Sequence, residues 1–251
     1  MEMDIFTLVL LFFAGAFAGF VDSIAGGGGI ITLPALLAAG IPPHQALATN
    51  KLQSSFGSFT ATYNYTKKGL LQPRKLLLGV LFTFFGAAAG AIAVQYFDAK
   101  FLESFIIIML VVIFIYTFLS PNLGAIHTKA KVSQLFFYIL FGFTIGFYDG
   151  FFGPGTGSFW TIALILMLGL NLKAATAQTK LFNFTSNIVS LAVFIYSGLV
   201  LWVVGVVMGA GQIIGAYLGS SMVAKREVKF IRYIFLIVVG VTIIKLSFEY
   251  F

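Results

Sequence analysis

The sequence predicts an all-α polytopic membrane protein made of two inverted-topology repeats. Composition is the first reason: 60% of the 251 residues are apolar, 9% are charged, and the mean hydropathy is +1.03. A soluble domain needs more polar surface than this composition supplies. The second reason is a series of apolar runs, several of them long enough for a membrane-spanning helix of about 20 residues. The third is an internal repeat, which divides the chain into residues 1–125 and 126–251.

Each repeat contains about five hydrophobic segments in the same order. The first repeat has apolar runs at residues 5–21, 30–39, 46–65, 76–97 and 101–119. The second repeat has them at residues 132–147, 158–168, 174–196, 199–223 and 230–248. The second run of each repeat follows a glycine-rich turn and is too short to span a bilayer alone. We therefore expect a short or broken helix at this position in both repeats.

The two repeats keep one register over a long distance. Residues 19–29 match residues 146–156 with an offset of 127 (149 − 22), measured on the aspartates. Beyond that turn the offset is 129 (180 − 51), and it holds for the pair Lys51 and Lys180 and for the connections that follow. An internal duplication of this kind is typical of transporters.

Basic residues in the connections indicate that the two copies are inverted. Residues 67–75 include four Lys or Arg, whereas the matching residues 196–199 include none. The bias reverses at the next connection, where residues 225–232 carry four basic side chains and residues 98–103 carry one. Because Lys and Arg gather in cytoplasmic loops, the matching loops should lie on opposite sides of the membrane. Counted from there, both termini are expected outside.

The two glycine-rich turns are the first candidate substrate-binding elements. Their candidate residues are Gly27, Gly28 and Gly29 in the first repeat and Gly155, Thr156 and Gly157 in the second. Glycine lets a ligand approach the backbone closely, and the first turn of a helix presents free N–H groups with partial positive charge. Together these features predict a seat for an anion. Tight crossing of two helices is the alternative explanation for the glycines.

The third run of each repeat is too polar for a helix that faces lipid. The substrate-binding candidates on its polar face are Asn50 and Ser54 in the first repeat and Thr179, Asn183 and Asn187 in the second. Their helical spacing places them on one side of each helix. This side either lines a cargo pathway or makes hydrogen bonds between helices, and the two roles are compatible.

Two lysines and two aspartates lie within or beside the hydrophobic segments near the turns. Lys51 and Lys180 occupy matching places early in the third runs, where each either binds the substrate or extends to the nearer membrane surface. Asp22 and Asp149 precede the glycine turns. They are candidates for proton coupling, and their alternative role is to cap free N–H groups or to neutralise a nearby lysine.

Other classes of function find little support in the sequence. The chain contains no Cys, which excludes disulfides and thiolate metal sites. The two histidines, His44 and His127, fall in connections and form no metal pair or catalytic group. The net charge of +7 is explained by cytoplasmic loops, so nucleic acid is not expected as a partner. We predict no enzyme activity, no cofactor and no metal.

The segments around the turns resemble a known family. They are G-F-V-D-S-I-A-G-G-G-G-I-I-T-L-P-A-L and A-L-A-T-N-K, with degenerate copies in D-G-F-F-G-P-G-T-G-S-F and A-T-A-Q-T-K. These motifs are similar to those of the TauE/SafE sulfite exporter family, also called the 4-toluenesulfonate uptake permeases. The resemblance covers nearly the whole chain, and it implies a membrane protein that moves sulfite, sulfonates or related organic anions.

The residues and the resemblance together predict a secondary transporter for a small anion in the cytoplasmic membrane. The expected partners are a small anionic substrate and the lipid bilayer, and a homo-oligomer is left open. A passive anion channel is the alternative function. A membrane-embedded enzyme or scaffold is the third class that we consider.

Overall fold

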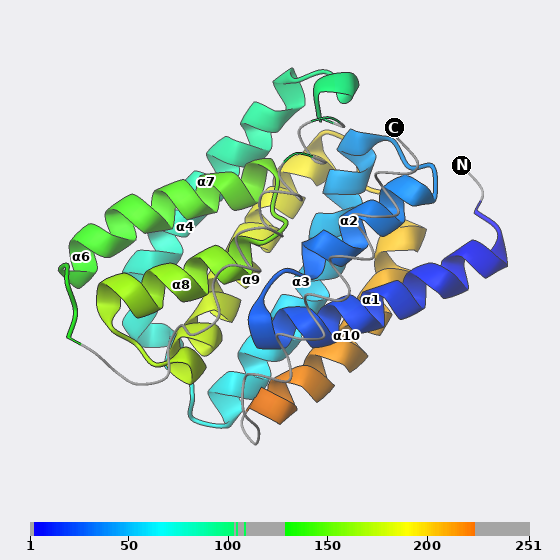
Figure 1. Cartoon of the computed structure of the whole chain (residues 1–251). Coiled ribbons are helices and arrows are strands. Elements are labelled where there is room, and N and C mark those ends of the chain that lie inside the picture. The colour runs from blue at the N-terminus through cyan, green and yellow to red at the C-terminus, as the bar shows by residue number, and fades with distance from the viewer. Residues whose placement is uncertain (1–2, 103, 105–107, 109–128, 224–251) are drawn as a thin grey trace.

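The computed structural model describes residues 3–102, 104, 108 and 129–223, and these residues form helices with no strand among them. The first repeat contributes α1 (Ile5–Ala25), α2 (Gly28–Ala38), α3 (Pro43–Lys67) and α4 (Leu77–Ala93), with the 3₁₀ turns η1 (Pro73–Leu76) and η2 (Val94–Tyr96) on either side of α4. The second repeat contributes α6 (Gln134–Phe137), the π-helical segment η3 (Tyr138–Gly142), α7 (Phe143–Phe151), α8 (Thr156–Leu168), α9 (Leu172–Tyr196) and α10 (Trp202–Val223), all visible in Figure 1.

The predicted all-helical class is confirmed by this architecture, whereas the division into two inverted repeats stays a prediction. The short helices α2 and α8 lie where the short runs were expected, directly after the glycine-rich turns. One detail was wrong, because His44 lies in the first turn of α3 and not in a connection. The apolar runs at residues 101–119 and 230–248 fall largely or wholly outside the described residues, as do the basic connection at residues 225–232 and His127.

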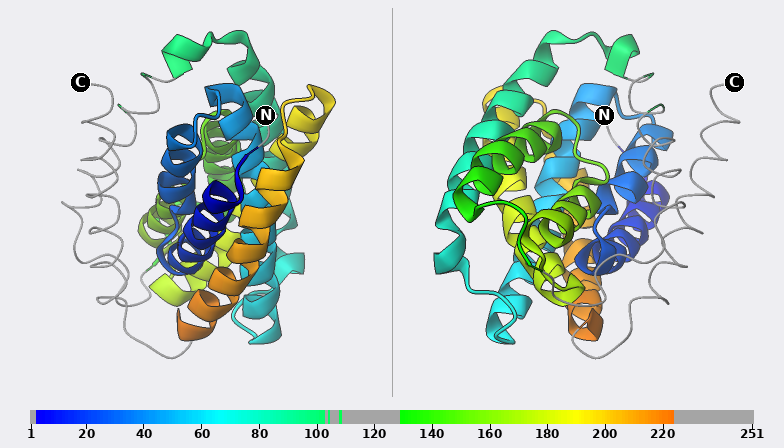
Figure 2. Two further views of the ribbon diagram at one scale, coloured as in Figure 1. Left: turned by 90° about the vertical axis from the view of Figure 1, so that its right-hand side faces the viewer. Right: turned by 60° about the vertical axis from the view of Figure 1, so that its left-hand side comes forward.

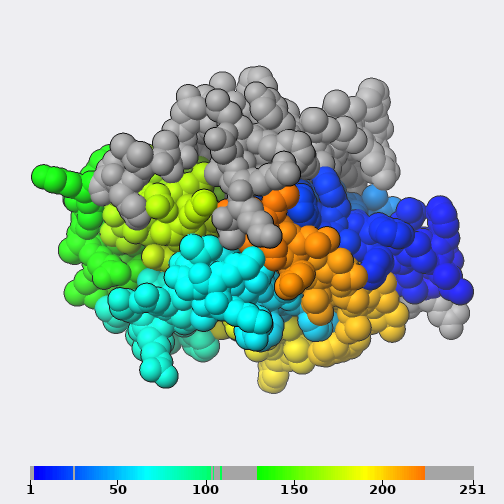
Figure 3. All heavy atoms as spheres, turned by 90° about the horizontal axis from the view of Figure 1, so that it is seen from below, coloured from blue at the N-terminus to red at the C-terminus, as the bar shows by residue number. Residues whose placement is uncertain are grey.

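Within the described residues, four helical segments are long and apolar enough to cross a membrane. They are Ile5–Ile24, Pro73–Tyr96, Gln134–Phe151 and Trp202–Val223. Large apolar side chains such as Phe6, Phe85 and Ile214 are more than half exposed on their outer faces. Figure 3 shows α10, in orange, on such a surface between α1 and the segment where α3 ends and α4 begins. Exposed apolar side chains of this size are stable against lipid and costly in water.

The central helices α3 and α9 have the opposite distribution of side chains. They pack against each other, and α3 also contacts α10 while α9 contacts α4. Both helices bury polar side chains, which include Asn50, Lys51, Gln53, Ser58, Asn64, Thr179, Lys180, Asn183, Ser186 and Asn187. Polar groups at membrane depth persist only where protein or a water-filled cavity satisfies them. The bundle is therefore polar at its centre and apolar at its surface.

The outer helices of each repeat pack on the other repeat, α1 against α10 and α4 against α7. Glycine makes both contacts close. A Cβ atom at Gly15 would meet the backbone carbonyl of Met208, and one at Gly86 would meet the carbonyl of Phe143. Small residues allow helix backbones to approach in this way inside a membrane. The two repeats are thus interlocked and do not stand side by side as separate bundles.

Corresponding helices of the two repeats run in opposite directions. In Figure 1, α1 runs from the N-terminus toward the left, whereas α7 runs from α6 at the left toward the right. The C-terminal ends of α3 and α9 lie at opposite ends of the molecule in Figures 1 and 2. This is the arrangement that two inverted copies would produce, and the inverted topology remains our proposal.

The breaks before α2 and α8 depend on glycine. Gly26 ends α1 with a φ of 74°, and Gly155 precedes α8 with a φ of 80°. Residues with a side chain rarely adopt a positive φ, whereas glycine does so without steric cost. The chain can therefore reverse inside the bundle and start a new helix there, so that the N-termini of α2 and α8 lie at the centre of the protein.

Candidate functional site

The two glycine-rich turns contact each other at the middle of the molecule. A Cβ atom at Gly157 would lie 2.6 Å from the Cα atom of Gly26, and one at Gly29 would lie 3.2 Å from the Cα atom of Pro154. The hydroxyl of Ser158 also donates a hydrogen bond to the carbonyl of Gly26 at 3.4 Å. The starts of α2 and α8 are therefore held together, backbone against backbone.

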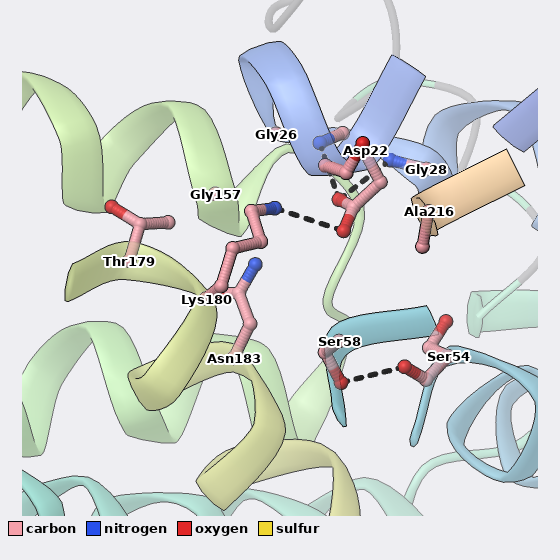
Figure 4. Close-up of polar contacts among 12 residues, drawn as sticks. Asp22, Gly26, Gly28, Ser54, Ser58, Gly157, Thr179, Lys180, Asn183 and Ala216 are labelled. Atoms are coloured by element: carbon pink, nitrogen blue, oxygen red, sulfur yellow. Dashed lines mark hydrogen bonds and ion pairs between the residues drawn. The ribbon is translucent and has the colours of Figure 1, made fainter. Parts of the chain in front are cut away.

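Asp22 is the residue that joins the first turn to the second repeat (Figure 4). Its Oδ1 atom accepts hydrogen bonds from the backbone N–H groups of Gly27, at 3.0 Å, and Gly28, at 3.1 Å. Its Oδ2 atom accepts one from Nζ of Lys180 in α9 at 2.8 Å. A carboxylate near the C-terminal end of α1 interacts unfavourably with the negative end of that helix dipole. The N–H groups at the start of α2 and the ammonium of Lys180 compensate for this cost.

Asp149 occupies the matching place before the second turn. Its Oδ1 atom lies 2.6 Å from Nζ of Lys51 in α3. Lys51 also donates to the backbone carbonyl of Asp149, and the hydroxyl of Ser186 donates to Oδ2. The Lys51 and Asp149 side chains are 1% and 5% exposed, so this is a buried ion pair with several hydrogen bonds. Such pairs are stable only when the remaining polar atoms are also satisfied, as they are here.

The alternatives left open for the four charged residues are thus reduced. Lys51 and Lys180 do not extend to a membrane surface, because both are buried and paired. Asp22 caps free N–H groups and neutralises a lysine at once, whereas Asp149 neutralises a lysine and accepts from a hydroxyl. In each pair the lysine and the aspartate come from different repeats.

A matched pair of hydrogen bonds connects each short helix to its polar neighbour. Thr32 of α2 donates to Oδ1 of Asn50 in α3 at 2.5 Å. Thr161 of α8 lies 3.1 Å from Thr179 of α9, hydroxyl to hydroxyl. Both residues of the second pair follow those of the first by 129 positions, which is the offset found in the sequence. The polar faces of α3 and α9 therefore serve in packing as well as in lining the centre.

A small cavity of about 30 Å³ lies between the turns and the polar helices. Its lining residues are Asp22, Gly27, Gly28, Gly29, Asn50, Lys51, Ser54, Asp149, Gly153, Thr156, Gly157, Asn183 and Asn187. This volume accommodates about two water molecules. Within the part of the chain that the structure describes, the Oδ1 atom of Asn183 has no hydrogen-bond partner although the residue is only 6% exposed. A buried acceptor without a partner indicates that a ligand or water belongs beside it.

Most of the residues predicted as a binding site meet at this cavity. Three of them do not line it: Gly155 precedes α8, Thr179 pairs with Thr161, and Lys180 is turned toward Asp22. Gly153 belongs to the predicted second turn but was not among the candidate binding residues; it does line the cavity, with a φ of 99°. The signal for Gly153 was available in the G-P-G sequence of the second turn.

The fold and this site together define a class of protein. The chain is a helical membrane protein with a buried, charge-lined cavity between two broken helices, an arrangement that characterises membrane transporters. The chain belongs to the sulfite exporter TauE/SafE family, whose sequence profile matches residues 11–246.

Several relatives extend over nearly the whole chain. It is 44% identical over 242 residues to the probable membrane transporter protein YfcA of Escherichia coli K12, covering 96% of this chain and 90% of the relative. It is 42% identical over 232 residues to a probable membrane transporter protein of Haemophilus influenzae, covering 92% and 91%. The probable membrane transporter protein YdhB of Bacillus subtilis is 27% identical over 223 residues, covering 85% and 88%. No solved structure matches the chain.

Proposed function

We propose that this protein is a secondary transporter that moves a small anion, such as sulfite, a sulfonate or a related organic anion, across the cytoplasmic membrane. The family supports transport as the activity. The observation that carries the choice of cargo is the cavity between the two turns, which combines Lys51, backbone at helix N-termini and side-chain amides. Donors of these kinds recognise the oxygen atoms of small oxyanions.

Each lining group has a distinct role in this proposal. The starts of α2 and α8 supply partial positive charge from the two repeats, and Lys51 supplies a full charge. Asn50, Ser54, Asn183 and Asn187 offer hydrogen bonds, and Thr156 lies at the first turn of α8. No single side chain dominates, so the site should depend on the relative position of the two repeats.

The same geometry suits alternating access. The cavity lies where the repeats meet, so movement of one repeat against the other would change which side of the membrane it faces. We place both termini outside and the basic residues 67–75 in the cytoplasm. Membership in a transporter family supports the part of the proposal that assigns no enzyme activity to the protein.

A binding screen tests the cargo. Protein purified in detergent is heated with sulfite, methanesulfonate, acetate or chloride, because a ligand that binds only the folded state raises the unfolding temperature. We expect sulfite or methanesulfonate to stabilise the protein in a dose-dependent way. Chloride at equal ionic strength controls for salt. If no anion among them stabilises it, the proposed cargo class is wrong.

Transport separates a carrier from a channel. Protein reconstituted in liposomes that contain unlabelled anion should take up labelled anion by saturable counterflow. A passive anion channel would instead show high conductance across a planar bilayer and no counterflow. Conductance without counterflow would show that the protein is a channel and not a carrier.

A further inference from the structure

The charges around the cavity balance before any cargo is present. Among the described residues, the charged side chains that line the cavity are Lys51, Asp149 and Asp22. Lys51 pairs with Asp149 at 2.6 Å, and Asp22 pairs with Lys180 behind it at 2.8 Å. A cargo anion would add an unpaired negative charge to a buried site, which is costly unless it is neutralised. Binding must therefore be linked to the withdrawal or neutralisation of a carboxylate.

The carboxylate of Asp22 already occupies the position beside the N–H groups of the first turn where an anion would bind. It accepts from Gly27, Gly28 and Lys180, which are two helix N-terminal N–H groups and an ammonium. Asp22 lines the cavity and Lys180 does not, so Lys180 meets the cavity only through this carboxylate. An anion that replaced Asp22 would gain all three donors.

The size of the cavity points to the same residue. Sulfite and a sulfonate head group each contain four heavy atoms, whereas a cavity of about 30 Å³ holds about two water molecules. Withdrawal of a lining group would give such an anion more room beside the two turns. The side chain of Asp22 is 19% exposed and that of Asp149 is 5% exposed, so Asp22 has more freedom to move.

The aspartate of the Lys51–Asp149 pair is more deeply buried than its counterpart Asp22. Lys51 donates to both the side chain and the backbone of Asp149, and Ser186 donates to the remaining oxygen. A Cβ atom at Gly153 would lie 2.8 Å from Nζ of Lys51, which shows how closely the turn encloses the pair. The two aspartates match in sequence but differ in their hydrogen-bond partners and in their burial.

We infer that Asp22 is the coupling site for a proton: one proton binds its carboxylate whenever a cargo monoanion replaces it on Lys180 and the N–H groups of the first turn. The inference rests on the proposed function, because it requires an anion in this cavity. The proton forms an O–H bond at Asp22 and leaves when the anion leaves, so one proton and one anion move together. A buried carboxylate that loses its cation takes up a proton because the charged form is then unfavourable.

The groups around Asp22 are consistent with this exchange. The ionisable side chains that face it are Lys180 of α9, Lys51 and Tyr65 of α3, and Asp149 of α7. Neither α2 nor α8 contains an ionisable side chain, and the one in α10, Tyr217, is exposed. Tyr65 donates to the carbonyl of Ser23 at 2.6 Å, so its hydroxyl is engaged elsewhere.

The test compares anion affinity across pH, with methanesulfonate as the probe because it stays a monoanion throughout. In the wild type, affinity should fall as the pH rises, by at most about tenfold per pH unit, the limit for linkage to one proton. Asp22→Asn keeps an acceptor for Gly27 and Gly28 but cannot titrate, and it leaves Lys180 free to pair with the anion. Its affinity should be higher than that of the wild type at high pH and independent of pH.

The control is Asp98→Asn, which removes an exposed carboxylate that does not line the cavity and should retain the pH dependence. Retention of the pH dependence in Asp22→Asn would overturn the assignment. If Asp22→Asn does not fold, Asp22→Glu decides, because a different acid at the coupling site must shift the pH midpoint of binding. An unchanged midpoint would also overturn the inference.

Proteoliposomes give a second readout. With the membrane voltage held at zero, a pH gradient should drive methanesulfonate uptake by the wild type, accompanied by acidification of the lumen. Asp22→Asn should show anion counterflow without proton movement. Wild-type uptake that does not change with the pH gradient would refute proton coupling but would still support anion transport. Absence of both binding and uptake would refute the proposed function itself.

Discussion

Lys51 of α3 and Asp149 of α7 form an ion pair at 2.6 Å although they are 98 positions apart in the chain. Their counterparts Lys180 and Asp22 form the second pair at 2.8 Å. Each lysine therefore neutralises the aspartate of the other repeat. Because both pairs cross the boundary between the repeats, they connect the two parts of the protein that alternating access would move.

The first prediction concerns the contribution of the Lys51–Asp149 pair to the free energy of unfolding. Lys51→Gln leaves Asp149 buried without its cation and should lower the free energy of unfolding by about 3–5 kcal/mol. The double variant Lys51→Gln/Asp149→Asn removes both charges and should recover most of the loss. Thermal unfolding in detergent measures the effect.

The exposed Lys75 provides the control for this experiment. Lys75→Gln should change the free energy of unfolding by no more than about 0.5 kcal/mol, as usual for surface substitutions. Equal, small effects at Lys51 and Lys75 would show that the buried pair contributes nothing to stability.

The second prediction concerns the contact between the turns. Helix propensity alone predicts that Gly157→Ala stabilises α8 by about 0.5–1 kcal/mol. The structure predicts the opposite sign, because the new Cβ atom would lie 2.6 Å from the backbone of Gly26. The variant should be less stable and should lose anion binding, measured by thermal shift with methanesulfonate.

The control is Gly40→Ala. Gly40 has a φ of 77° and open space around its Cβ position, so only backbone strain of about 1–3 kcal/mol is expected, with binding retained. Normal binding in Gly157→Ala would mean that the turns need not touch for the site to form.

The third prediction separates two asparagines that the sequence treated alike. Oδ1 of Asn50 accepts from Thr32 and Gln53, so Asn50→Leu removes two buried hydrogen bonds and should lower the free energy of unfolding by about 1–3 kcal/mol. Within the described residues Oδ1 of Asn183 has no partner, so Asn183→Leu should keep its unfolding temperature. Because Asn183 lines the cavity, the variant loses an amide N–H donor for the anion and should bind it more weakly. Normal affinity in Asn183→Leu would remove this side chain from the site.

The fourth prediction concerns topology. Lys67 and Tyr196 are the last residues of α3 and α9, both are exposed, and they match at the offset of 129. The chain has no native Cys, so Lys67→Cys and Tyr196→Cys each provide a single reactive thiol. An impermeant reagent should label Lys67→Cys from the cytoplasmic side and Tyr196→Cys from the outside. Labelling from one side in both variants would refute the inverted repeat.

The sequence alone was sufficient to predict the helical class, the positions of the helices and the irregular turns. Hydrophobic runs and positive-φ glycines are local properties, and they can be recognised without knowing what packs against them. The polar faces of α3 and α9 were also visible, because their residues recur at helical spacing.

The tertiary structure decided how the four charges combine and which asparagine is left without a partner. The sequence placed Asp22 and Asp149 in equivalent positions, and it left capping, neutralisation of a lysine and proton coupling all open. Their partners come from helices of the other repeat, so the pairing depends on how α3 and α9 pack at the centre. Distances of 2.6 and 2.8 Å across this interface arise only after the repeats interlock, because electrostatic pairing depends on separation in space and not on position along the chain.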